Sequence, residues 1–226
     1  MEIANKCNYF IFAVVTQVAQ AHQPYLGLNV GSDFFTARQT ITALNIPGQV
    51  KRPHSVNGFV ADLIAGVDVL KKGACKINAE AFGGYHIGAT NIQNTLSGPP
   101  FVGNLKQKLT YNVGIRALPT YEMNPHVDLF TLVGFEQKQL KSESEDGVVE
   151  GPSGVRRINF NGLQLGGGAV VALADNWKLR VQGHYAMYAG KTTTTSSNGL
   201  NQLPIRIKMS PYAILFSVGL FKAPSI

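Results

Sequence analysis

Apolar and polar positions alternate most clearly over residues 162–190. Leu, Val, Ala and aromatic residues mostly occupy the odd-numbered positions, and Gly, Gln, Lys, Arg and His mostly occupy the even-numbered ones. A period of two is typical of a β-strand whose two faces meet different surroundings. Asp175 and Asn176 interrupt the pattern, and both residue types favour turns. The stretch is therefore predicted to form two antiparallel strands joined by a tight turn.

Each predicted arm of this hairpin is long for a soluble protein, in which strands usually have about 5 to 6 residues. A tilted strand that crosses a bilayer needs about 9 to 11 residues. The polar face is rich in Gly, with scattered charges, and does not carry the continuous Lys/Glu surface of a solvated sheet. Such a face is expected where strands crowd together inside a narrow barrel.

The same alternation predicts six further strands, at 25–36, 55–69, 76–89, 106–118, 127–138 and 209–221. Long connections are expected at 37–54, 90–105, 139–157 and 191–208. Short ones are expected at 71–73, 119–126 and 174–176, where the two prolines of 119–126 are expected to end strand pairing. Outer-membrane barrels alternate long external loops with short periplasmic turns in this way. The prediction is an all-β, eight-stranded antiparallel up-and-down transmembrane β-barrel with four long external loops and three short periplasmic turns.

The run GGGAVVALADNWKLRVQGHYAMY resembles the penultimate hairpin of the eight-stranded outer-membrane β-barrel family, which includes opacity-type surface antigens and the membrane domains of OmpA and OmpX. The matching positions are Leu173, Asp175, Asn176, Leu179, Arg180 and Tyr185. The resemblance implies location in the bacterial outer membrane and a structural or adhesion-like role. It also implies that the chain ends on an aromatic residue in phase with the lipid-facing set, but Phe221 is out of phase with Leu220.

The first 21 residues predict export. An apolar run at 9–15 precedes Ala19-Gln20-Ala21, a small-x-small cleavage pattern, so residues 1–21 are interpreted as a signal peptide and 22–226 as one barrel domain. The alternative is a short buried strand or anchor. Cleavage would leave Cys75 alone, without a partner for a disulfide or a thiol pair. No cofactor or metal is expected.

Composition narrows the class of partner. Only 15% of the 226 residues are charged, yet the net charge is +7. The excess of positive charge predicts attraction to anionic lipid or polysaccharide. No basic helix or basic-aromatic cluster favours nucleic acid. A monomer in contact with outer-membrane lipid and lipopolysaccharide is expected, with host or envelope ligands at the loops. Aromatic residues near strand ends are expected at the membrane interfaces: Tyr25, Tyr121, Trp177 and Tyr212.

Several charges fall on the inward-facing parity of the predicted strands, in the periplasmic half: Asp62, Glu80, Arg116, Asp128, Lys178 and Arg180. Charges inside a narrow barrel must be paired to offset lost hydration. They are interpreted as an ionic network that plugs the lumen, with Glu80 and Arg116 forming a pair. The alternative interpretation is an ion pathway, which would make the protein a narrow porin-like channel.

Catalysis is considered because some relatives in the resembled family modify lipid A. His86, His184 and Ser32 are the candidate residues, but they show no motif spacing, so no enzyme is predicted. Recognition through external loops is preferred. Arg38, Lys51 and Arg52 are candidates for contact with lipopolysaccharide phosphates. The acidic residues Glu143, Glu145 and Asp146 are candidates for bridging divalent cations, or are simply solvated.

Overall fold

The computed structural model describes residues 23–43, 49–87, 90–92, 105–144, 155–196 and 204–222. These residues form a single antiparallel sheet. Its strands, in chain order, are β1 (Pro24–Ala43), β2 (Gln49–Lys72), β3 (Cys75–Ile87), β4 (Thr90–Ile92), β5 (Leu105–Asn124), β6 (Val127–Ser144), β7 (Val155–Ala172), β8 (Trp177–Tyr188), β9 (Lys191–Ser196) and β10 (Pro204–Lys222).

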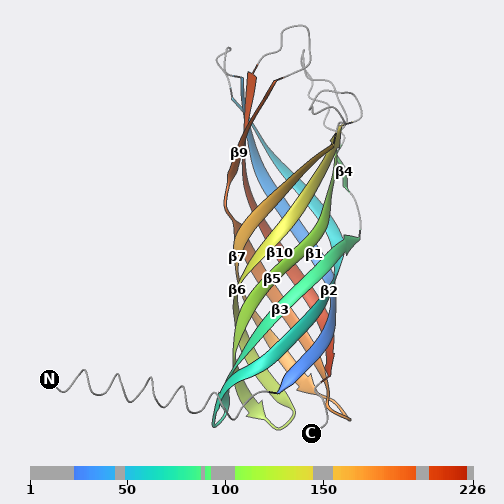
Figure 1. Cartoon of the computed structure of the whole chain (residues 1–226), viewed down its shortest axis with the longest axis vertical. Helices are drawn as coiled ribbons and strands as arrows, with labels where there is room; N and C mark the ends of the chain where they lie inside the picture. Colours follow the sequence, from blue (N-terminus) through green and yellow to red (C-terminus); the bar gives the residue numbers. More distant parts are fainter. Residues whose placement is uncertain are drawn as a thin grey trace, which may run out of the picture.

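The sheet closes on itself. Neighbouring strands pair in the order β1, β2, β3, β5, β6, β7, β8 and β10, and β10 pairs with β1 to complete the ring. The short strands continue their predecessors: β4 follows β3 and pairs with β5, whereas β9 follows β8 and pairs with β10. The prediction of an eight-stranded up-and-down barrel is confirmed (Figure 1). Within the described part of the chain, no helix is both long and apolar enough to span a membrane.

The two ends of the barrel differ. Tight turns join β2 to β3, β5 to β6 and β7 to β8 at one end, while β4 and β9 mark the other end (Figure 1). In the β7–β8 turn, Asp175 and Asn176 adopt φ values of 57° and 63°, the left-handed region that Asn and Asp tolerate best among non-glycine residues. In the predicted outer-membrane barrel the short turns face the periplasm, so the end with β4 and β9 corresponds to the external end.

The strands extend further towards the external end than predicted. The expected loop 37–54 is mostly strand, because β1 continues to Ala43 and β2 begins at Gln49. The expected loops 139–157 and 191–208 likewise lose residues to β6, β7, β9 and β10. The prediction failed here because it used alternating hydrophobicity to define strands. Backbone pairing can continue above the bilayer, where the outward face meets water and no longer needs apolar side chains.

The prediction that proline ends strand pairing at Pro119 was also wrong. Residues 119–126 were expected to form a turn, but β5 continues through Pro119 to Asn124 and the turn lies at Pro125 and His126. Pro119 still stands opposite Ile77 of β3 in the ladder. A single proline removes one N–H donor from a ladder, and the long antiparallel pairing on both sides compensates for that loss.

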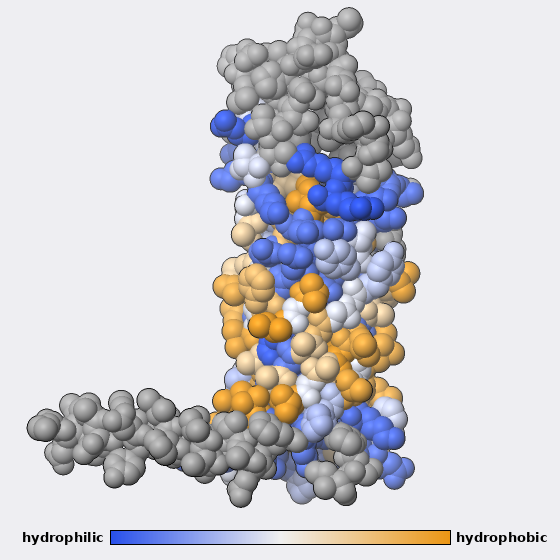
Figure 2. All heavy atoms as spheres, viewed as in Figure 1, coloured by the Kyte–Doolittle hydropathy of each residue, from blue (hydrophilic) through white to orange (hydrophobic). Residues whose placement is uncertain are grey.

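The barrel carries apolar side chains on its outer face. Leu26, Phe59 and Ile115 are 64%, 68% and 65% exposed, and exposed apolar side chains occur on every long strand of the ring. Figure 2 shows hydrophobic residues gathered in a band across the visible face of the barrel, with hydrophilic residues above and below it. Such a band is the expected lipid-facing surface of a transmembrane barrel.

The inner face is filled with side chains, and inward glycines provide the room. A Cβ on Gly66 would collide with the ring of Tyr25, and one on Gly27 would collide with Phe221. Tyr25 therefore points into the barrel, so its predicted place in an interfacial aromatic belt is wrong. Phe221 is 3% exposed and packs inside against Ile64 and Phe82, as its parity indicated.

Candidate functional sites in the lumen and at the external rim

The lumen is built in layers, which are easiest to follow along β6. From the periplasmic end, its inward side chains are charged at Asp128, apolar at Phe130 and Leu132, charged again at Glu136 and Lys138, and apolar at Leu140. Neighbouring strands supply further charged side chains. Together they form an ion-paired group around Asp128 at the periplasmic mouth and two ionic layers deeper in the lumen, one in the periplasmic half and one in the external half.

The periplasmic-half layer is centred on Glu80. Its Oε2 accepts a hydrogen bond of 2.7 Å from Nε of Arg116 and one of 3.0 Å from Nη1 of Arg180. Its Oε1 accepts hydrogen bonds from Nη2 of Arg180 at 2.5 Å and from the Tyr25 hydroxyl at 2.6 Å. One carboxylate thus joins strands β1, β3, β5 and β8 across the lumen.

Aromatic rings flank the two arginines of this layer. The Arg116 guanidinium lies 4.9 Å from the centre of the Phe82 ring. The Arg180 guanidinium lies 4.0 Å from the Phe221 ring centre and 5.4 Å from that of Phe130. Cation–π contacts of this kind favour the charged guanidinium where water is scarce. The inward Phe221 ring therefore stabilises the Arg180 guanidinium in the lumen.

Asp62 lies beside this layer. Its Oδ1 accepts a hydrogen bond of 3.0 Å from Nδ2 of Asn112 on β5. Gly84 of β3 pairs with Asp62 in the ladder, and a Cβ at Gly84 would overlap both Asp62 and Asn112. Glycine is thus required at this inward position for the carboxylate to reach its partner.

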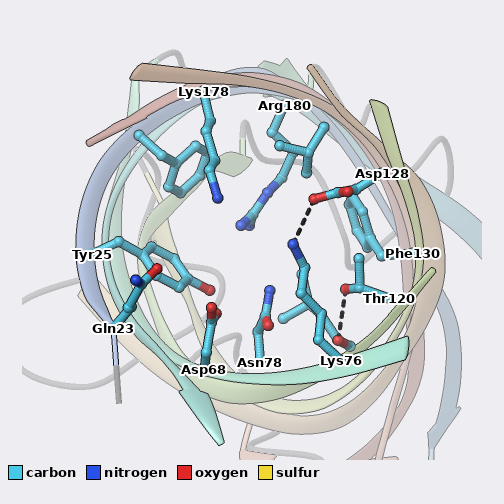
Figure 3. A pocket seen from close by; sticks show the side chains of 13 residues that line it. Gln23, Tyr25, Asp68, Lys76, Asn78, Thr120, Asp128, Phe130, Lys178 and Arg180 are labelled. Carbon is cyan, nitrogen blue, oxygen red and sulfur yellow. Dashed lines mark hydrogen bonds and ion pairs between the residues drawn. The ribbon is translucent and has the colours of Figure 1, made fainter. Parts of the chain in front are cut away.

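The periplasmic mouth holds the other predicted lumen charges. Lys76 Nζ bonds to Asp128 at 2.6 Å and lies 3.6 Å from Glu122, which also pairs with Lys71 at 2.9 Å. The bond from Lys71 lowers the pKa of the Glu122 carboxyl. Lys76 and Asp128 line a cavity of about 30 Å³, which Arg180 and Phe221 also line. Figure 3 shows Lys178 pointing into this cavity, opposite Asp68.

The external-half layer is centred on Lys138, which is fully buried. Its Nζ bonds to Asp33 at 2.6 Å and lies 3.6 Å from Glu136. Glu136 also accepts hydrogen bonds from the Tyr188 hydroxyl and, at 2.6 Å, from Nε2 of Gln164. Strands β1, β6, β7 and β8 are joined here.

The two candidate histidines belong to this external-half layer. Nδ1 of His86 lies 3.5 Å from Asp33, and Nε2 of His184 lies 3.4 Å from Gln164. Ser32 has the opposite parity to Asp33 and lines a groove on the outer face with Phe216. The structure therefore does not bring the three residues considered for catalysis together.

An apolar cluster lies on the external side of this layer. Phe35, Phe160 and Tyr188 pack with ring centres 5.7 to 6.5 Å apart. Leu109, Leu140 and other buried side chains complete the cluster. Two ionic layers, the aromatic groups between and beside them, and this cluster occupy successive levels of the barrel interior.

The predicted rim residues have separate locations. Arg38 and Lys51 are exposed on the outer faces of β1 and β2, so they lie on strands and not in loops. Arg52 is part of β2, but its side chain is outside the described residues. Glu143 lies on β6 and pairs with Lys141, whose hydrogen bond lowers the pKa of the Glu143 carboxyl. Glu145 and Asp146 lie outside the described residues, as do residues 1–21.

Parity correctly grouped Glu80 with Arg116, but the six predicted lumen charges form three separate groups. Arg180 forms an ion pair with Glu80, and Asp128 forms one with Lys76. Asp62 accepts a hydrogen bond from Asn112. The external-half layer was missed. Asp33 and Glu136 have inward parity in the sequence, and the same rule would have identified them if it had been applied beyond the periplasmic half. The described residues include no group of three or more His, Cys, Asp or Glu placed to hold a metal ion.

A closed ring of eight strands, an apolar outer band and a charged interior define a transmembrane outer-membrane β-barrel. A family model described as "Outer membrane protein beta-barrel domain" matches residues 10–212. The chain therefore belongs to this family and is located in the bacterial outer membrane.

The chain is similar to several solved structures. A major outer membrane protein from Thermus thermophilus aligns with a TM-score of 0.51 at 12% identity, covering 86% of this chain and 99% of that one. The outer membrane protease OmpT from Escherichia coli aligns with a TM-score of 0.47 at 11% identity, covering 89% and 97%. Neisserial surface protein A aligns with a TM-score of 0.44 at 12% identity, covering 86% and 96%. No curated protein matches the sequence significantly.

Proposed function

We propose that this protein is a non-conducting outer-membrane barrel that acts as a rigid scaffold for surface recognition by its external segments. The observation that carries the proposal is the filling of the lumen at successive levels. Lys138, Glu136 and Glu80 have side chains that are at most 1% exposed. An eight-stranded barrel has an interior just wide enough for side chains, and here they bond to each other across it.

The layered interior also supports the scaffold role. Each ionic layer joins four strands, and some of its bonds connect residues far apart in the sequence, as does the bond of Lys138 to Asp33. Crosslinking of this kind holds the barrel in one shape, and loops on a rigid scaffold usually carry recognition. The external segments 44–48, 93–104, 145–154 and 197–203 are the proposed recognition elements.

Planar-bilayer recording tests the closed lumen. The wild-type protein should insert without steady conductance, with insertion verified by heat-modifiable migration on a denaturing gel. Large, stable channels in the wild type that are abolished by substitution of Asp62, Glu80 or Arg116 would favour the channel interpretation and contradict the proposal.

Attachment assays test the recognition role. Bacteria that display the protein should bind to host cells or to immobilised envelope polysaccharide, and replacement of the four external segments by Gly/Ser linkers should remove that binding. A matched control changes the periplasmic turn, Pro125→Ser with His126→Ser, and should attach like the wild type. Unchanged attachment after loop replacement, in a barrel that still shows heat-modifiable migration, would refute the recognition role.

A further inference from the structure

Basic side chains without acidic neighbours gather on the outer face of the barrel above the lipid-facing band. Residues 34–60 and 189–216 form the external halves of β1, β2 and β10 together with β9, and neither stretch contains an Asp or Glu. The basic residues of these strands that are exposed with outward parity are Arg38, Lys51, Arg206 and Lys208. The ring places β1 between β2 and β10, so the external parts of these three strands form one continuous surface.

The strand register focuses this charge around Thr40 of β1. Thr40 stands opposite Lys51 of β2 on one side and Lys208 of β10 on the other. Adjacent strands are about 4.8 Å apart, so the two lysines flank Thr40 closely. Arg38 shares the same face two residues nearer the membrane, about 7 Å along the strand. Arg38, Thr40, Lys51 and Lys208 are called the anion patch below.

The charges of the anion patch are not neutralised within the described part of the chain. Arg38, Lys51 and Lys208 are exposed, and none forms an ion pair with a described acidic residue. The outer face of β6 offers a contrast, since Lys141 there is paired with Glu143. Three cations held together without an internal counter-ion favour an external anion.

The depth of the anion patch identifies the source of that anion. Tyr212 of β10 pairs with Thr36 of β1, and Thr36 lies two residues nearer the periplasm than Arg38. Its ring packs 5.9 Å from that of Tyr185 on the outer surface. Tyrosines of this kind mark the membrane–water interface. Exposed Phe34 and Ile214 follow on the membrane side, so the patch lies at the level of lipid headgroups.

An apolar groove lies nearer the membrane centre on the same two strands. Val30 of β1 and Phe216 and Val218 of β10 line it, together with residues of β7 and β8. Its position is suited to an acyl chain. The charge above and the groove below match the two parts of an anionic lipid.

We propose that the anion patch binds a phosphate group of a phosphorylated lipid in the outer leaflet, whose acyl chain lies along this groove. The site depends on the location of the barrel in the outer membrane, and it does not depend on loop recognition or on a closed lumen. It adds Thr40 and Lys208 to the predicted contacts of Arg38 and Lys51.

Native mass spectrometry of the protein released from nanodiscs tests the proposal. The nanodiscs contain phosphatidylcholine with a small fraction of diphosphoryl lipid A. The wild type should retain lipid A, and the variant R38Q/K51Q/K208Q should bind it on the order of 100-fold more weakly, because each basic residue near an anionic membrane contributes about a factor of five. Fully dephosphorylated lipid A, with the same acyl chains, should not be retained by the wild type.

A matched control removes the same charge at the periplasmic end, with K71Q/K72Q/K222Q, and should retain lipid A like the wild type. A conservative variant, R38K/K51R, should also retain it. Heat-modifiable migration verifies that each variant is folded. Equal retention by the patch variant and the wild type, or an equal loss in the control, would overturn the proposal. Complete release of lipid A by millimolar inorganic phosphate would show that the patch takes a soluble anion instead.

Discussion

The two ionic layers of the lumen have opposite compositions. The periplasmic-half layer places one carboxylate, Glu80, between two arginines, whereas the external-half layer places one ammonium, Lys138, near two carboxylates. A planar guanidinium can stack on aromatic rings, so Arg116 and Arg180 can share a single carboxylate. A lysine ammonium is compact and has three donors, so it can serve two carboxylates at once.

The layers also differ in their access to water. The periplasmic-half layer borders the cavity at the periplasmic mouth, which Arg180 lines. The external-half layer lies under the apolar cluster of Phe35, Phe160 and Leu140. Loss of a charge should therefore be tolerated less well in the external half, where water cannot replace the missing partner.

The largest effect is expected for Lys138→Met. It leaves Asp33 and Glu136 buried without their cation, which should destabilise the barrel by about 3 to 5 kcal/mol. Urea unfolding of the protein in lipid vesicles, followed by gel migration, measures the change. The triple variant D33N/E136Q/K138M should recover part of the loss, since no unpaired charge remains. If Lys138→Met were as stable as the wild type, the external-half layer would not be an ionic centre.

A somewhat smaller effect, about 3 kcal/mol, is expected for Glu80→Gln. Arg116 and Arg180 then lose their carboxylate, but the aromatic rings and the nearby cavity partly stabilise them. The same unfolding assay applies. Because the structure adds Arg180 to the predicted pair, E80Q/R116M should recover less stability than E80Q/R116M/R180M. Equal recovery by the double and triple variants would mean that Arg180 does not depend on Glu80.

Between the layers, Gly84→Ala should cost about 1 to 3 kcal/mol, because the new methyl group displaces Asp62 or Asn112 in a filled interior. Its neighbour Gly83 is the matched control. Gly83 faces outward, where the nearest atom to an added Cβ is 4.0 Å away, so Gly83→Ala should be nearly neutral. Similar losses for both variants would indicate that the effect comes from the backbone and not from crowding around Asp62.

The smallest effect is expected at the periplasmic rim, outside both layers. Lys71 lowers the pKa of Glu122 in the folded state, so this pair stabilises the protein above the unfolded carboxyl pKa of about 4.3. The contribution is lost as pH falls through the lower folded pKa. At neutral pH, Glu122→Gln should cost less than about 1 kcal/mol, as exposed pairs do. Unfolding free energies of the wild type and Glu122→Gln, measured at several pH values, should become equal in acid. A difference that stays constant with pH would contradict the assignment of this pair.

The sequence by itself determined the inside and the outside of this barrel. Side chains alternate between the faces of a strand, so parity alone placed Val181 towards lipid and Arg180 towards the lumen, and the turn residues Asp175 and Asn176 marked where the chain reverses. Strand ends could not be predicted, because backbone pairing continues above the membrane where alternating hydrophobicity fades, as it does from Arg38 to Ala43.

Only the tertiary structure decided which charges meet. Parity places Lys138 and Asp33 inside, but it carries no information on contacts across the lumen between side chains 105 residues apart. Such contacts depend on how the ring closes and on the stagger of each strand against the next, which all eight strands determine together. For the same reason, only the pairing of β1 with both β2 and β10 brought Lys51 and Lys208 to opposite sides of Thr40.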